Sequence, residues 1–153
     1  MDLREELNQL IESLHQEHIP YALCGGMALA VHGHPRFTQD LDLLIQESDL
    51  ELLIEVAERL GYQDISGWLR FNTGTDRETK PYRLLKPLGT ENLMLDLICV
   101  TSQFEGVWQS RTQFDIASTR MTVVSRDGLR KMKQISNHAQ DLVDLEKLDE
   151  TPE

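Results

Sequence analysis

The sequence predicts an α+β (mixed α/β) fold in which one mixed sheet is flanked by helices, and two observations support this. Apolar residues recur at helical spacing in the segment 2–17, and helical patterns return after residue 48 and after residue 125. Between them lie short apolar or alternating segments, 21–24, 40–45 and 92–100, with the length and period of strands. Interleaved helices and strands are typical of a sheet covered by helices.

The first third of the chain is expected to form two helices around a short strand. Pro20 closes the connection after the helix 2–17, and residues 21–24 form a buried strand. Gly25 and Gly26 then form a turn, and residues 27–32 form a short helix.

The next segments alternate between strand and helix. Residues 40–45 read DLDLLI, which begins with the period of a strand. Ser48 and Glu51 have the spacing of a capping box, and Gly61 is expected to end the helix that follows.

The second half continues the sheet and ends in helices. A strand pair with a hairpin-like loop is expected in 67–86, and the apolar run 92–100 is a further strand. The remaining expected elements are strands 112–116 and 119–124, a helix capped by Ser125 and a last helix 137–149.

Length and charge limit the classes of function. The 153 residues suit one domain, expected over 1–150, with 150–153 as a disordered tail. The formal net charge is −11, which argues against a large nucleic-acid-binding face, although a small basic patch stays possible. No signal-like or membrane-spanning run is present, so a cytoplasmic protein without membrane contact is expected.

Gly25 and Gly26 stand where a short strand turns into a helix. Backbone N–H groups at such a place can bind phosphate, and glycine lets the ligand approach because it has no Cβ atom. A simple tight turn is the alternative interpretation.

Asp40 and Asp42 lie two residues apart on an expected strand, so their side chains share one face of the sheet. Two carboxylates so close repel each other, and a divalent cation such as Mg²⁺ would offset that repulsion. An exposed polar face on an edge strand is the alternative, but the neighbouring leucines favour a buried strand.

Asp96 lies within the apolar strand NLMLDLICV, where an unpaired carboxylate is costly. If this strand lies beside 40–45, the three carboxylates converge and can hold two metal ions about 4 Å apart. Such a pair of ions activates an attacking hydroxyl and stabilises a leaving pyrophosphate.

Residues 24–45, CGGMALAVHGHPRFTQDLDLLI, resemble the signature of the DNA polymerase beta-like nucleotidyltransferase superfamily. That signature has Gly-Gly or Gly-Ser, a spacer, acid-x-acid between apolar residues, and a third acid on a later strand. Here Gly25 and Gly26 precede a 13-residue spacer, then Asp40 and Asp42, with Asp96 as the third acid. The segments RFTQDLDLLI and QDLVDLEKL resemble the minimal AbiEii-like and lincosamide-nucleotidyltransferase-like branches, which implies the nucleotidyltransferase fold.

The resemblance also implies roles for matching residues. Asp40 and Asp42 would bind two Mg²⁺ ions, and Asp96 would bind the catalytic ion and accept the proton of the attacking hydroxyl. The glycine pair would hold the phosphates of a nucleoside triphosphate.

Basic and hydroxyl residues would support this phosphate site. Arg36 and Thr38 would brace the acids or contact phosphate. Many relatives carry lysine at the position of Gln140, and Lys131 or Lys133 is expected to serve instead.

The expected function is Mg²⁺-dependent transfer of a nucleoside monophosphate from an NTP to a hydroxyl of a small molecule, tRNA or protein, with a role in a toxin–antitoxin system. One alternative is a nucleotide-binding regulatory or antitoxin module of the same fold with little catalysis. Another is a metal-dependent phosphohydrolase that uses water. Because a chain of this size lacks a large second domain, a homodimer or an antitoxin partner is expected to complete the site.

Overall fold

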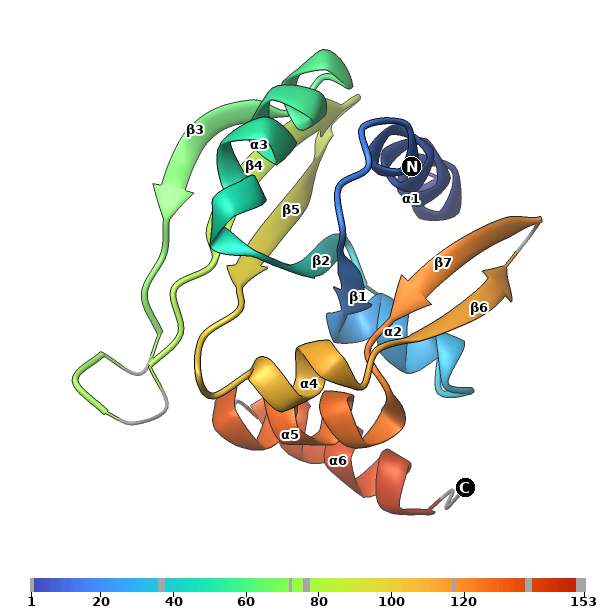
Figure 1. Ribbon diagram of the computed structural model, residues 1–153, viewed down its shortest axis with the longest axis vertical. Helices are drawn as coiled ribbons and strands as arrows, with labels where there is room; N and C mark the ends of the chain where they lie inside the picture. The colour runs from blue at the N-terminus through green and yellow to red at the C-terminus, as the bar shows by residue number, and fades with distance from the viewer. Residues whose placement is uncertain are drawn as a thin grey trace.

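The computed structural model describes most of the chain, and Figure 1 shows its path from the N- to the C-terminus. The described residues are 2–35, 38–71, 73–75, 78–116, 118–136 and 139–150. Arg36 and the expected tail after residue 150 lie outside them. Within the described residues, no helix is long and apolar enough to cross a lipid bilayer.

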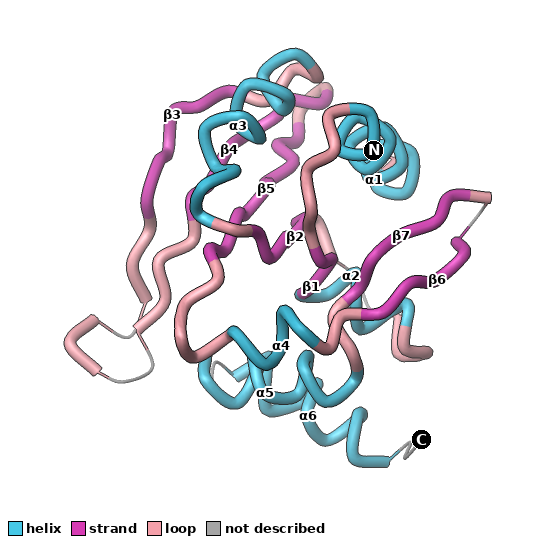
Figure 2. Tube along the Cα trace, viewed as in Figure 1, coloured by secondary structure: helices cyan, strands magenta, loops and turns pink. Residues whose placement is uncertain are grey.

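A seven-stranded sheet organises the described part of the chain, in the order β3-β4-β5-β2-β1-β7-β6 (Figures 1 and 2). The strands are β1 (Ala22–Cys24), β2 (Asp40–Ile45), β3 (Gln63–Trp68), β4 (Tyr82–Leu88), β5 (Glu91–Cys99), β6 (Thr112–Ile116) and β7 (Thr119–Val123). β2 pairs parallel with β5, and β1 pairs parallel with β7, whereas the other pairs are antiparallel. The predicted mixed sheet flanked by helices is therefore confirmed.

Helices pack around this sheet. They are α1 (Leu3–Gln16), α2 (Gly25–Val31), α3 (Leu50–Arg59), α4 (Glu105–Gln109), α5 (Arg126–Ser136) and α6 (Ala139–Glu150), with a 3-10 turn η1 (Glu47–Asp49). α1 contacts α3, whereas α5 packs against both α4 and α6 in a separate group (Figure 1).

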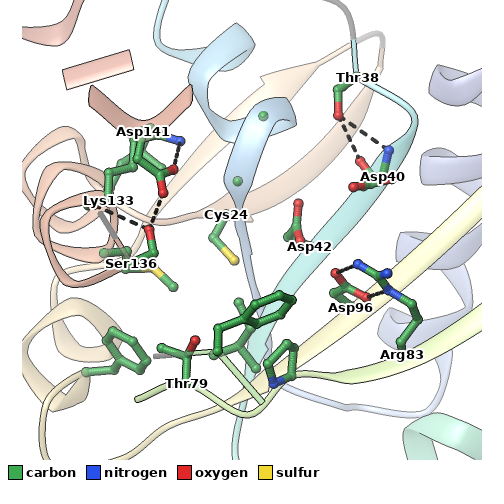
Figure 3. A pocket seen from close by; sticks show the side chains of 18 residues that line it. Cys24, Thr38, Asp40, Asp42, Thr79, Arg83, Asp96, Lys133, Ser136 and Asp141 are labelled. Atoms are coloured by element: carbon green, nitrogen blue, oxygen red, sulfur yellow. Dashed lines mark hydrogen bonds and ion pairs between the residues drawn. The ribbon is translucent and has the colours of Figure 1, made fainter. Parts of the chain in front are cut away.

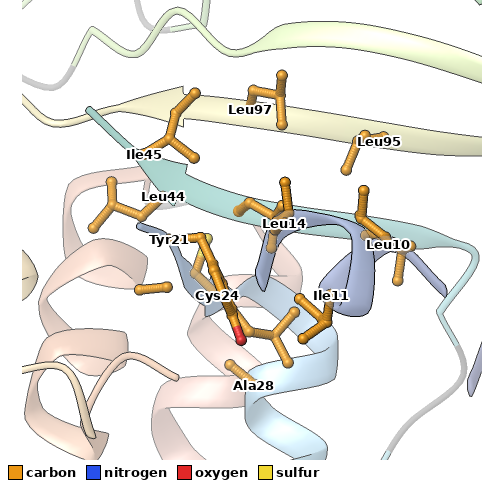
Figure 4. Close-up of a cluster of buried hydrophobic side chains, with 14 of the residues drawn as sticks. Leu10, Ile11, Leu14, Tyr21, Cys24, Ala28, Leu44, Ile45, Leu95 and Leu97 are labelled. Atoms are coloured by element: carbon orange, nitrogen blue, oxygen red, sulfur yellow. The ribbon is translucent and has the colours of Figure 1, made fainter. Parts of the chain in front are cut away.

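The core forms between α1 and the central strands. The buried cluster contains Leu10, Ile11 and Leu14 of α1 with Ile45 of β2 and Leu95 of β5, and all five side chains are fully buried (Figure 4). Burial of large aliphatic side chains contributes roughly 1.5 to 3 kcal/mol each. The core therefore anchors β2 and β5, the two strands that carry the predicted acids.

The glycine pair belongs to α2 and does not form a separate turn, which corrects the predicted helix start at Met27. α2 begins at Gly25, directly after β1. Gly25 has φ +66°, a left-handed conformation that glycine adopts without the penalty of a Cβ atom. One residue therefore reverses the chain between strand and helix.

The predicted capping box at Ser48 and Glu51 was wrong. Ser48 lies inside η1, where the N–H of Asp49 donates to the carbonyl of Gln46, and α3 begins only at Leu50. The helix has no side-chain cap because this 3-10 turn already leads the chain into it.

The strand pair predicted in 67–86 exists, but its first strand begins earlier, at Gln63. Gly67, with φ +69°, lies within β3 beside a register shift, so a bulge accommodates it inside the strand. The helix α4 was not predicted because its five residues are too few for a periodic pattern. The last helix begins at Ala139, and residues 137 and 138 of its predicted start lie outside the described residues.

Candidate active site

Four side chains form one row across the middle of the sheet. Cys24 on β1 is the register partner of Asp42 on β2, and Asp42 is the partner of Asp96 on β5. Asp96 is in turn the partner of Arg83 on β4. The strand with Asp96 therefore lies beside the strand with Asp40 and Asp42, which is the condition under which the three carboxylates were expected to converge.

This row forms one wall of a cavity of about 400 Å³ (Figure 3). Gly25 and Gly26 also line it. The other polar lining residues are Thr38, Asp40, Thr79, Lys133, Ser136 and Asp141, and the apolar ones are Phe71, Pro81, Ile98, Phe104, Leu129 and Met132. One cavity thus combines acids, two cations, glycine backbone and an apolar side.

The carboxyl of Asp42 is strongly perturbed by its surroundings. Burial, followed by the negative charges of Asp96 and Asp40, raises the pKa of Asp42 to about 7, and Lys133 and Arg83 oppose that rise. No hydrogen bond or ion pair joins its carboxyl to another side chain in the described parts of the chain. A half-buried carboxyl without such a partner is costly when ionised, and a bound cation would relieve this cost.

Gly25 allows the backbone of α2 to approach Asp42. A Cβ atom placed on Gly25 would lie 2.2 Å from Oδ2 of Asp42, far inside van der Waals contact. The left-handed φ of +66° also disfavours any side chain there. Two independent features therefore require glycine at position 25: the left-handed backbone conformation and the close approach to the carboxylate of Asp42.

Thr38 supports the start of β2. Its Oγ1 accepts a hydrogen bond from the backbone N–H of Asp40 at 3.3 Å, and its hydroxyl donates to the Asp40 carbonyl at 3.5 Å. Thr38 therefore orients the backbone that carries the acid, and its hydroxyl faces the same cavity (Figure 3).

Asp96 is engaged by Arg83 in a two-point ion pair. Nε of Arg83 donates to Oδ1 at 2.7 Å, and its Nη2 donates to Oδ2 at 2.8 Å (Figure 3). The hydrogen bonds and charge of Asp96 raise the pKa of Arg83 further above its already high value. In the sequence Arg83 is only one of several basic residues of 70–86, and its partner depends on the register of β4 with β5.

Lys133 forms the cationic side of the cavity. Its Nζ donates to Oδ2 of the fully buried Asp144 at 2.8 Å and lies 3.6 Å from Oδ1 of Asp141. Ser136 donates its hydroxyl to Asp141 (Figure 3). Lys131, the other lysine predicted to contact phosphate, is exposed on α5 and does not line the cavity.

The residues present fit a divalent cation such as Mg²⁺ in donor chemistry. Mg²⁺ prefers carboxylate oxygens and is usually held by one or two carboxylates plus substrate phosphates. Asp40 and Asp42 offer such oxygens beside the cavity. Within the described residues, no three His, Cys, Asp or Glu side chains are placed to hold a metal together, and the carboxylate of Asp96 is turned to Arg83.

The fold occurs in solved nucleotidyltransferase structures of low sequence identity. Lincosamide antibiotic adenylyltransferase LnuA with bound lincomycin is 13% identical, and 95% of each chain is covered with a TM-score of 0.63. A nucleotidyltransferase from Thermotoga maritima, described as putative, is 13% identical, covered at 97% of this chain and 93% of that one, with a TM-score of 0.65. These likenesses show the fold.

A third structure, ANT(2″)-Ia in complex with adenylyl-2″-tobramycin, is 15% identical with a TM-score of 0.65, and the match covers 94% of this chain and 86% of that one. A search of curated protein sequences returned no match. The family model of the AbiEii nucleotidyl transferase toxin of type IV toxin–antitoxin systems matches residues 7–126, which include the glycine pair and all three acids. The chain therefore belongs to the AbiEii family of nucleotidyltransferases.

Proposed function

We propose that the protein transfers a nucleoside monophosphate from an NTP to a hydroxyl group, with Mg²⁺, and releases pyrophosphate. One observation carries the proposal: Asp42 and Asp96 are register partners that line one cavity with Asp40 and with the backbone of Gly25. Carboxylates beside the glycine backbone that lines the cavity suit a metal-bound triphosphate, because the acids attract the cation and the backbone approaches the phosphates.

Each residue has a chemical role in this proposal. Asp40 and Asp42 hold Mg²⁺, which when bound polarises the phosphate and favours ionisation of the acceptor hydroxyl. Asp96 lies on the same side of the cavity and accepts the proton of that hydroxyl. The acceptor oxygen forms a bond to the α-phosphorus, and the bond from that phosphorus to the β-phosphate oxygen breaks, so pyrophosphate leaves with the electron pair.

The cationic and backbone groups bind the phosphates. Gly25 and Gly26 let the triphosphate approach the backbone, and Lys133 balances its charge from α5. Thr38 holds the start of β2 in place, and Arg36, which lies outside the described residues, is proposed to contact phosphate.

The acceptor is proposed to be a small molecule, a tRNA or a protein, within a toxin–antitoxin system of the cytoplasm. The net charge of −11 disfavours the polyanionic tRNA among these three. A second copy of the chain or an antitoxin partner is proposed to complete the acceptor side of the cavity.

Label transfer tests the function. The protein is incubated with each α-³²P-labelled NTP, Mg²⁺ and a panel of total tRNA, candidate proteins and lincosamide or aminoglycoside antibiotics. We expect label on one class of acceptor and none with EDTA. Nucleotide binding by calorimetry without transfer to any acceptor would instead favour the binding or antitoxin module, and label released only as free nucleotide would indicate a phosphohydrolase.

Gly25→Ala is expected to weaken nucleotide binding by about tenfold or more. Its Cβ would displace Asp42, and the left-handed backbone would cost about 1 to 2 kcal/mol. Gly67→Ala is the matched control, because Gly67 has φ +69° but no atom within 4 Å of an added Cβ. Calorimetric titration with a non-hydrolysable NTP should separate the two variants. If Gly25→Ala and Gly67→Ala lose the same affinity for the nucleotide, a strained backbone that destabilises the fold, and not contact with Asp42, causes the loss.

A further inference from the structure

We propose that Arg83 controls when Asp96 becomes a metal ligand. In the free protein Arg83 holds Asp96, so a single divalent cation binds at Asp40 and Asp42. A triphosphate then takes over the guanidinium of Arg83 and releases Asp96 for a second cation. This inference rests on the proposed function and assigns to Arg83 a positioning role in it.

The geometry of the pair is the first argument. Both carboxylate oxygens of Asp96 accept a short hydrogen bond from Arg83, and the Asp96 side chain is only 9% exposed. A two-point guanidinium–carboxylate pair is among the strongest hydrogen-bonded contacts in proteins. A cation that needs an oxygen of Asp96 must therefore compete with Arg83.

The formal charge of the cluster is the second argument. Three carboxylates, Asp40, Asp42 and Asp96, and one guanidinium together carry two negative charges. One divalent cation neutralises them, and a second would leave an excess of positive charge in a half-buried site. A triphosphate supplies the negative charge that a second cation requires, so the second ion is expected to arrive with the nucleotide.

The difference between the two cations of the cavity is the third argument. Lys133 contacts two carboxylates, one of them fully buried, and is itself buried, so it is fixed in place. The Arg83 side chain is 24% exposed and lines the cavity. A phosphate offers a guanidinium the same two-point hydrogen bonding as a carboxylate, so the incoming triphosphate can exchange with Asp96.

Metal stoichiometry tests the proposal without reference to turnover. Mn²⁺ is titrated into the protein, and bound ions are counted by electron paramagnetic resonance and calorimetry, with and without an α,β-methylene NTP analogue. We expect one ion in the parent protein without nucleotide and two with it. The Arg83→Gln variant is expected to bind the second ion without nucleotide, with an affinity at least about tenfold above that of the parent.

Arg70→Gln is the matched control, because Arg70 pairs with Glu78 on the neighbouring loop and does not line the cavity. The Arg70→Gln variant loses one positive charge, as Arg83→Gln does. We expect it to bind one ion in the absence of nucleotide, as the parent protein does. Arg83→Lys keeps the positive charge but loses the two-point hydrogen bonding to Asp96. Its affinity for the second ion in the absence of nucleotide is expected to lie between those of the parent and Arg83→Gln. This conservative variant also provides a comparison that does not depend on how well Arg83→Gln folds.

Four results would overturn the proposal. The parent protein could bind two ions already in the absence of nucleotide. It could also bind only one ion both in the absence and in the presence of nucleotide. Arg83→Gln could bind the same number of ions as the parent, in which case Arg83 only stabilises the sheet. Binding of no Mn²⁺ under any condition would overturn the proposed function as well, whereas metal-dependent label transfer with unchanged stoichiometry would overturn the role of Arg83 alone.

Discussion

Asp42→Asn is expected to lower nucleotidyl transfer by about a thousandfold or more. Asp42 lies against the glycine backbone, and an amide offers a cation no negative charge. Loss of several kcal/mol of metal-ion stabilisation corresponds to a rate loss of that size, since each 1.4 kcal/mol is about tenfold. Label transfer at saturating Mg²⁺ measures it, and Asp115→Asn, which removes an exposed acid of β6, serves as the control.

The same variant is expected to be more stable than the parent in metal-free buffer at neutral to alkaline pH. The pKa of Asp42 is about 7 in the folded protein against an ordinary value of 3.8, so ionisation opposes folding. The cost is absent below pH 3.8, grows as the pH rises, and is complete above about pH 7. The amide of the variant avoids it, which is worth up to about 4 kcal/mol, because each pKa unit corresponds to about 1.4 kcal/mol.

Urea unfolding in EDTA at pH 5 and pH 8 measures this gain. The difference between variant and parent should be larger at pH 8, and Asp115→Asn, which removes an exposed acid, is measured beside it as the control. A variant that is inactive and also less stable than the parent at pH 8 would mean that Asp42 supports the fold and is not a strained functional acid. Full activity with a native fold would exclude Asp42 as a metal ligand.

Lys133→Met is expected to lower the free energy of unfolding by about 3 to 5 kcal/mol. The substitution leaves the carboxylate of Asp144 buried without its cation, which is the costly way to break a buried ion pair. Lys131→Met is the matched control, since Lys131 is exposed on the same helix and should change stability by less than about 0.5 kcal/mol.

Replacing both partners separates the charge from the packing. Lys133→Met combined with Asp144→Leu removes the buried pair entirely, and we expect it to recover most of the lost stability, as apolar replacements of buried ion pairs often do. Urea unfolding of the two single variants and the double variant forms a double-mutant cycle. A double variant as unstable as Lys133→Met alone would show that packing around Lys133, and not its charge, holds α5 to α6.

The acids of the candidate site were accessible to sequence reasoning, but the partner of Asp96 was missed. Asp40, Asp42 and Asp96 stand out because carboxylates are rare in apolar strands, and adjacent strands bring them together. Arg83 faces Asp96 because residues 89–90 form a two-residue turn that fixes the register of β4 with β5. The glycine of that turn, Gly89, was the signal that could have revealed the pair.

The local sequence of α5 also does not indicate which of its two lysines faces the cavity. Lys131 and Lys133 lie two residues apart and therefore point in different directions, so only one of them can face the cavity. The choice falls on Lys133 because Asp144 and Asp141 of α6 lie beside it. Short elements also escaped prediction, since α4 and η1 contain too few residues for a period to show.

The cavity draws its acids and its cationic wall from different parts of the chain. The glycine pair, the three predicted metal ligands and Arg83 lie within residues 25–96, whereas Lys133, Ser136 and Asp141 come from the two helices after residue 125, beyond the segment 7–126 that matches the family model. During translation, the chain therefore acquires the predicted metal ligands and Arg83 before the side of the cavity that Lys133 forms. A polypeptide that stops near residue 125 would keep every predicted metal ligand but lose the side of the cavity that Lys133 forms, so a late nonsense mutation is expected to weaken nucleotide binding even though the acids remain.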